Sequence, residues 1–120
     1  MKHLPALLVL FCVPAMASDT RVLTGDEIVA LLPTITATTD TTRQTFAADG
    51  GTVFANASRT SKGRWRVHGD HYCSTWLPSN TWRCYAVEVE KAGNRDPDRI
   101  IWIDVELGDR TVNDILPRAQ

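Results

Sequence analysis

The chain has 120 residues, of which 22% are charged and 43% are hydrophobic, with 7 Gly and 6 Pro. This composition is that of one ordinary globular domain, and it excludes a collagen-like repeat, a coiled coil, a disordered acidic tail and a two-domain enzyme. The net charge of −1 provides no overall positive field that would recruit nucleic acid or an anionic membrane.

Residues 1–17 have the order of a secretory signal peptide. A short polar head, an apolar run and the small residues Ala15 and Ala17 follow one another. The apolar run is about ten residues long, too short for the roughly 20 residues that cross a bilayer as a helix. We therefore expect cleavage after Ala17 and a single β-rich domain over residues 18–120. The product would be periplasmic or secreted, with no membrane contact after cleavage.

The cysteines indicate one disulfide. Cys12 lies inside the apolar run, and Phe11 precedes it where a lipoprotein signal needs Gly or Ala. Cleavage removes Cys12 and leaves Cys73 and Cys84 in an oxidising compartment, where cysteine pairs normally form disulfides. A metal site would need further ligands at fixed spacing, and a catalytic thiol would need a nearby base. We therefore predict a Cys73–Cys84 disulfide.

One short helix is predicted near the start of the mature domain. Thr24 and Glu27 have the T-x-x-E spacing of a capping box. An apolar stretch follows over residues 28–32, and Pro33 ends the element. A helix of about two turns is marginal in water, so its apolar side must dock on the rest of the domain.

The rest of the chain alternates strand-like segments with turn signals. Asp49 and Gly50 mark a hairpin turn. Strands are predicted over residues 34–39, 43–48, 52–58, 64–68, 71–77, 81–90 and 99–107, and the segment 111–116 is either a strand or one helical turn. The predicted fold is mainly β with one short N-terminal helix. It is a small antiparallel up-and-down barrel or a strongly curved meander sheet of about seven strands, with the helix plugging an open end.

The turns fix the register of three strands. A two-residue Gly-Asp turn at residues 69–70 places His68 opposite His71. A turn centred on residues 78–79 places Cys73 opposite Cys84, close enough to bridge. The hairpin register and the disulfide are independent inferences from the sequence, and they therefore support each other.

Alternation along these strands separates two faces. The predicted core face holds Trp65, Val67, Tyr72, Trp76, Tyr85, Val87 and Val89. The face that mostly meets solvent holds Arg64, Arg66, His68, His71, Cys73, Trp82, Cys84, Ala86, Glu88 and Glu90. In the last long strand, the core pattern continues in Ile101, Ile103, Val105 and Leu107, which alternate with Trp102, Asp104 and Glu106.

Four motifs follow one another over residues 23–107: a Leu-Thr-x-x-Glu-Ile helix, an Asp-Gly turn, a Gly-x-Trp strand and a Cys pair on neighbouring strands. The positions that carry them are Leu23, Thr24, Glu27, Ile28, Asp49, Gly50, Gly63, Trp65, Cys73 and Cys84. In this order the chain resembles small exported proteobacterial proteins of an uncharacterised domain family, from which it departs in a longer loop at residues 91–97 and a Trp-rich hairpin. The resemblance implies an exported single domain and brings no activity or catalytic residue.

Two histidines are candidate metal ligands. His68 and His71 flank one tight turn, and Glu88 lies on the adjacent strand, a set that can hold Zn²⁺ or Cu²⁺. A functional site needs three or four ligands and a supporting shell, so the favoured interpretation is two solvated histidines beside a turn. No cofactor is expected.

A basic and aromatic surface is the candidate binding site. Trp82 and Arg66 share a face and can form a cation–π contact, with Arg64 beside them. Because Trp and Arg anchor interfaces, we predict that this surface recognises an anionic ligand or an acidic protein partner; export argues against nucleic acid. The alternatives are a solvated basic edge that discourages strand pairing, and a Trp82 side chain that merely covers the disulfide.

Enzymatic signals are weak. The sequence has no G-x-S-x-G elbow, and the carboxylate pairs Asp104–Glu106 and Glu88–Glu90 are expected on an exposed sheet surface. We expect a non-enzymatic binding or interaction module whose barrel end or Trp-lined surface recognises a small ligand or another exported protein. The alternatives are an inhibitor of a secreted hydrolase, and a small hydrolase or metal-dependent enzyme that uses His68 and His71.

Overall fold

The computed structural model describes residues 19–91 and 96–117. The predicted signal segment at residues 1–17 therefore lies outside the described residues, as does part of the loop predicted at residues 91–97. The elements in chain order are β1 (Asp19–Val22), α1 (Gly25–Leu31), the 3-10 turn η1 (Leu32–Thr34), β2 (Ile35–Thr38), β3 (Thr42–Phe46), β4 (Gly51–Asn56), β5 (Thr60–His68), β6 (His71–Trp76), β7 (Arg83–Lys91), β8 (Arg99–Asp104) and β9 (Arg110–Pro117).

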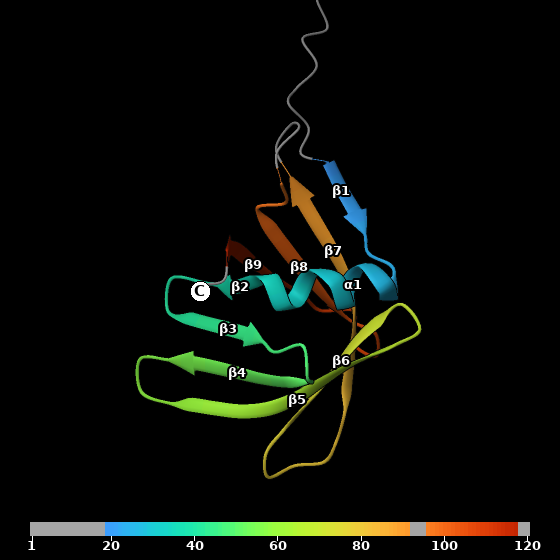
Figure 1. The fold of residues 1–120 in the computed structure, drawn as a ribbon. Coiled ribbons are helices and arrows are strands. Elements are labelled where there is room, and N and C mark those ends of the chain that lie inside the picture. The colour runs from blue at the N-terminus through green and yellow to red at the C-terminus, as the bar shows by residue number, and fades with distance from the viewer. Residues whose placement is uncertain (1–18, 92–95, 118–120) are drawn as a thin grey trace, which may run out of the picture.

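Strands β2 to β9 form a closed antiparallel barrel of eight strands (Figure 1). Each strand pairs with its neighbours in the sequence, β9 pairs with both β8 and β2, and this last pairing closes the ring. The predicted mainly β fold is thus confirmed in its barrel form, and the segment at residues 111–116 is a strand. The extra strand β1 pairs with the second half of β7, beyond the end of β6.

The predicted register of the central strands is confirmed. His68 lies opposite His71 across the tight β5–β6 turn. Cys73 lies opposite Cys84, and the two form a disulfide. One detail differs, because β6 and β7 are joined by the longer loop at residues 77–82, and β7 begins two positions later than expected.

The predicted core face is wrong in β8. Ile100 and Trp102 are the buried inner residues, opposite Val89 and Val87, whereas Ile101 and Ile103 pair with the outer-face residues of β7. Residues 100–103 are all apolar, so alternation by itself could not tell the inner set from the outer set. The strand ends at Asp104, and Val105 and Leu107 lie beyond it, exposed in a turn.

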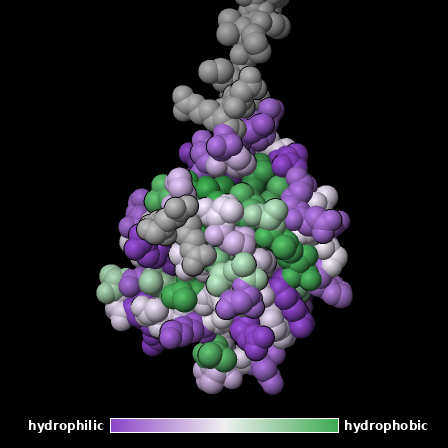
Figure 2. Space-filling model, in the orientation of Figure 1, coloured by the Kyte–Doolittle hydropathy of each residue, from purple (hydrophilic) through white to green (hydrophobic). Residues whose placement is uncertain are grey.

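Helix α1 closes one end of the barrel, as predicted. Its capping box is present: Thr24 Oγ1 accepts from the Glu27 backbone N–H, and the Glu27 carboxylate accepts from the Thr24 N–H. Ile28 is fully buried among the barrel side chains. In Figure 1 the helix runs across the ring of strands. Figure 2, drawn from the same side, shows apolar and hydrophilic residues intermixed on the face toward the viewer.

A glycine lets the helix approach the barrel. The Gly25 backbone N–H donates to Asp70 Oδ1 in the β5–β6 turn at 2.8 Å. A Cβ at this position would lie 2.1 Å from the backbone oxygen of Gly69, so any other residue would push the helix away from the turn.

An aromatic cluster fills the half of the barrel beneath the helix. Phe46 is fully buried, and its ring meets those of Trp65 and Tyr72 edge to face, with centroids 6.1 and 5.8 Å apart. The Trp102 ring lies 5.9 Å from Phe46. The buried Trp65 also donates its indole N–H to the backbone oxygen of Ala47 at 2.9 Å, so its one polar atom is satisfied inside the core.

The disulfide gives a first prediction. Cys73 and Cys84 are 11 positions apart, and closing a loop of this size should contribute about 2–3 kcal/mol through the unfolded chain. We expect the double variant Cys73→Ala and Cys84→Ala to remain folded and to melt roughly 8–20 °C lower than the parent protein. Thermal unfolding followed by circular dichroism measures this difference. An unchanged melting curve, or two free thiols titrated in the oxidised native protein, would reject the assignment.

Candidate functional site

The barrel interior is hollow at the end opposite α1. Successive turns of an up-and-down barrel alternate between its ends, and α1 docks on the β5–β6 turn. A cavity of about 750 Å³ opens toward the other end, where the β2–β3, β4–β5 and β6–β7 loops supply Thr39, Arg59 and Leu77 to its rim. Its walls are formed by Ala37, Thr42, Gln44, Phe54, Ser61, Tyr72, Ser74, Trp76, Tyr85, Trp102, Thr111 and Asn113.

Aromatic rings form the floor and part of the wall. Tyr72 and Trp102 belong both to the buried core and to the cavity lining, and their ring centroids are 4.8 Å apart. These two rings therefore separate the filled half of the barrel from the hollow half. Nearer the rim, Phe54 and Trp76 meet edge to face at 6.2 Å. Such flat apolar surfaces suit stacking against a planar ligand.

Amide side chains supply polar groups at defined positions on the wall. Gln44 Nε2 donates to Thr52 Oγ1 at 3.0 Å and to the Tyr72 hydroxyl at 3.2 Å. Asn113 Oδ1 accepts from the indole N–H of Trp102 at 2.7 Å. These bonds fix both amides and orient the floor rings, so the cavity wall is preorganised before any ligand enters.

Tyr72 stays protonated over the whole physiological range. Burial raises the pKa of Tyr72 to about 12, and its side-chain interactions with Ser74 and Gln44 offset only part of that increase. The cavity floor therefore presents a neutral phenol rather than a phenolate, and the floor itself contributes no negative charge that would repel an anion.

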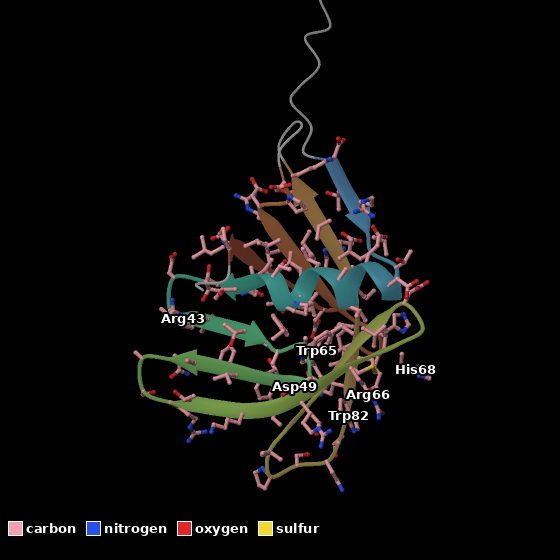
Figure 3. All side chains as sticks on the ribbon, in the orientation of Figure 1. Arg43, Asp49, Trp65, Arg66, His68 and Trp82 are labelled. Atoms are coloured by element: carbon pink, nitrogen blue, oxygen red, sulfur yellow. A yellow bond between two sulfur atoms is a disulfide. The ribbon has the colours of Figure 1, made fainter. Side chains whose placement is uncertain are left out.

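The predicted outer surface forms its expected contact. The Arg66 guanidinium carbon lies 3.9 Å from the centroid of the Trp82 ring, and Figure 3 shows the two side chains side by side. Arg64 is exposed two positions earlier on the same strand. The cation–π pair is confirmed, whereas its role in recognition stays a prediction.

The loop at residues 77–82 covers the outer face of β6. Cys73 and Thr75 lie on that outer face, yet they are only 1% and 5% exposed. Thr75 Oγ1 donates to the backbone oxygen of Ser79 at 3.2 Å, so the loop folds back over the strand. Trp82 ends this loop, an arrangement that supports the alternative in which Trp82 covers the disulfide.

The predicted metal site at His68 and His71 gains no third ligand among the described residues. His68 and His71 are exposed, and Figure 3 shows His68 at the edge of the molecule, directed away from the barrel. Glu88, the predicted third ligand, instead accepts from Arg110 at 3.0 Å. Over residues 19–91 and 96–117, no three His, Cys, Asp or Glu side chains are grouped so that they could hold a metal ion.

Asp104 is buried rather than exposed, which corrects the prediction for the Asp104–Glu106 pair. Its Oδ1 accepts from the backbone N–H groups of Glu106 and Leu107, and its Oδ2 accepts from Arg83 at 3.0 Å. These two backbone donors, followed by Arg83, hold the pKa of Asp104 below its ordinary value. Asp104 thus organises the β8–β9 turn, and its carboxylate is fully engaged in structural contacts.

Sequence reasoning did not single out the cavity. Gln44, Phe54 and Arg59 come from β3, β4 and the β4–β5 loop, which are neighbours in the chain, and barrel closure brings Asn113 of β9 to them. One signal was present: Gln44 is a polar residue at an inward position of β3, since it pairs with Phe54 on β4 and with Ala37 on β2. A polar side chain on the inner face of a small barrel indicates a cavity or an internal hydrogen bond.

The fold and this site define a closed antiparallel barrel with a helix over one end and a ligand-sized cavity at the other. No family model, curated protein or solved structure matches the chain. The resemblance to exported proteobacterial proteins therefore stays a prediction. Within the described part of the chain, no helix is long and apolar enough to cross a membrane.

The position of Trp82 leads to a second prediction. If Trp82 covers the disulfide, Trp82→Ala should lower the melting temperature by several degrees, equivalent to about 1–2 kcal/mol, because apolar area is lost over Cys73. Reduction of the disulfide by dithiothreitol should also become faster. The matched control is Arg64→Ala on the same face, which should leave both quantities unchanged. Equal melting and equal reduction rates in Trp82→Ala would instead favour the predicted recognition surface.

Tyr72 leads to a third prediction. In the unfolded chain its hydroxyl titrates near the ordinary pKa of 10.0, and in the folded protein near 12. The stabilisation is complete below pH 10 and is lost as the pH rises toward 12, because the unfolded chain releases its proton first. The loss amounts to about 2–3 kcal/mol. Between pH 9 and 11.5, the urea unfolding midpoint of the parent should fall relative to that of Tyr72→Phe, which has no hydroxyl to titrate at this position. Parallel curves would contradict the shift.

Proposed function

We propose that the protein is an exported, non-enzymatic binding module that takes a small, mainly apolar ligand into the open end of its barrel. The single observation that carries this proposal is the cavity of about 750 Å³, closed below by Tyr72 and Trp102. Ligand sites typically occupy about 300–1,000 Å³, with apolar walls and a few fixed polar groups. Eight-stranded barrels are wide enough to hold one such ligand.

The chemistry of the lining supports binding rather than catalysis. The cavity residues offer aromatic rings, amides, hydroxyls and one guanidinium. General acid–base chemistry uses a group that titrates near the working pH, and Tyr72, the buried phenol of the lining, has a pKa of about 12. Hydrogen bonding and stacking are the interactions that such a lining favours.

The disulfide supports an exported location. A bridged pair such as Cys73–Cys84 is consistent with an extracellular or periplasmic compartment, where disulfides persist. The signal-like order of residues 1–17 points the same way. We propose that the mature domain acts in the periplasm or after secretion. The Trp82–Arg66 surface is retained as a predicted contact for another exported protein.

The cavity is tested with a neutral probe and one filling variant. N-phenyl-1-naphthylamine is apolar, uncharged and fluorescent when removed from water, so its emission should rise saturably as it binds the parent protein. Ser61 lines the cavity and pairs with Phe54. Ser61→Trp should therefore fill the space that the probe would occupy. We expect it to weaken binding of the probe about tenfold or more, a loss comparable to that of one well-packed contact.

The matched control lies one position along the same strand. Lys62 is exposed on the outer face of β5, and Lys62→Trp adds the same side chain outside the barrel. It should bind the probe as the parent does. Circular dichroism confirms that both variants are folded. The proposal would be rejected if the parent showed no saturable binding, or if folded Ser61→Trp and Lys62→Trp bound the probe equally well.

A further inference from the structure

The charge at the cavity wall is positive. Among the described residues that line it, Arg59 alone is charged. Asp40, Glu106 and Asp109 belong to loops at the same end of the barrel, but none of the three lines the cavity. Within the described part of the chain, a ligand that enters the mouth therefore meets a guanidinium and no carboxylate at the wall.

The loop that bears Arg59 is held in place by a side chain. Asn56 Oδ1 accepts from the backbone N–H groups of Ser58 and Arg59, at 3.0 and 2.9 Å, and also from the Ser58 hydroxyl. The Asn56 N–H donates to the backbone oxygen of Arg59 at 2.9 Å. These bonds fix the backbone of Arg59 at the rim, which lowers the entropic cost of placing its guanidinium against a ligand.

Arg59 is also uncommitted to an internal partner. Arg21, Arg83, Arg99 and Arg110 each form an ion pair with a carboxylate. Across the described ranges, 19–91 and 96–117, no such pair involves Arg59. A guanidinium in this position can form a bidentate, charge-assisted contact with a carboxylate or a sulfonate.

The walls favour a planar aromatic body over an alkyl chain. Phe54, Trp76 and Trp102 provide flat surfaces for stacking. Gln44, Ser61 and Ser74 place polar groups among them, and a saturated chain would remove water from these groups without replacing its hydrogen bonds. An aromatic molecule with polar substituents stacks on the rings and satisfies the polar groups.

We propose that the cavity selects a planar aromatic anion, an aromatic carboxylate or sulfonate, whose ring enters the aromatic walls and whose charge pairs with Arg59 at the mouth. This inference rests on the proposed binding function and specifies its ligand class. The juxtaposition that carries it is one guanidinium at the rim of an aromatic cavity, on a loop whose backbone Asn56 holds. Among the described residues this guanidinium has no ion-pair partner, and the cavity lining includes no carboxylate.

Two probes separate the charge from the ring. 1-Anilinonaphthalene-8-sulfonate has the same anilinonaphthalene body as the neutral probe and adds one sulfonate. Arg59→Gln keeps a polar side chain that can still donate hydrogen bonds, although it is shorter than arginine, and it removes the charge. It should weaken binding of the sulfonate about tenfold, as expected for a charge-assisted contact, and leave the neutral probe unchanged. Arg43→Gln, at an exposed position on the outer face of β3, is the matched control and should change neither affinity.

The outcomes distinguish this inference from the proposed function. Failure of the neutral probe to bind the parent would remove the cavity function itself. Equal sulfonate affinities in the parent and Arg59→Gln, or equal losses of both probes, would remove the role of Arg59 while leaving the cavity function intact. Displacement of the neutral probe by indole-3-carboxylate at lower concentrations than by decanoate supports the aromatic class, and the reverse order would overturn it.

Discussion

A layer of three aromatic rings across the barrel, Phe46, Tyr72 and Trp102, divides its interior into two halves. Their centroids lie 4.8 to 5.9 Å apart, within the range of favourable ring contacts. On one side the layer packs against the fully buried Ile28 of α1. On the other side it is the floor of the cavity. The core of the barrel and its candidate site therefore share the same side chains.

This division explains why the two ends of the barrel differ. At the filled end, Gly25 allows close docking of the helix on the β5–β6 turn, and the capping box holds the helix start. At the hollow end, residues 19–91 and 96–117 place no helix over the opening, and the rim is made of loops between strands. One of these loops fixes Arg59 through Asn56. Among the described lining residues, the one charged side chain is therefore presented at the rim from a loop whose backbone is held.

The disulfide stabilises the outside of the same wall. Cys73 and Cys84 bridge β6 and β7, the strands that supply Tyr72 and Tyr85 to the interior. Because strand side chains alternate, a bridge on the outer face fixes the register of the residues that face inward. The loop at residues 77–82 folds back over the outer face of β6 through the Thr75–Ser79 hydrogen bond. Its last residue, Trp82, contacts Arg66, so the outer surface is organised by the same register as the cavity.

Local signals in the sequence were enough for the helix cap, the β5–β6–β7 register and the disulfide, because each depends on residues close together in the chain. They failed in β8, where Ile100 to Ile103 are apolar on both faces and only pairing with β7 selects Trp102 as the inner residue. The buried Asp104 was missed for a related reason, since its donors lie in the turn that follows. The enclosed cavity depended on tertiary structure, because Asn113 of β9 faces Gln44 and its neighbours only when β9 closes the ring against β2, and pairing between strands so distant in sequence leaves no local pattern.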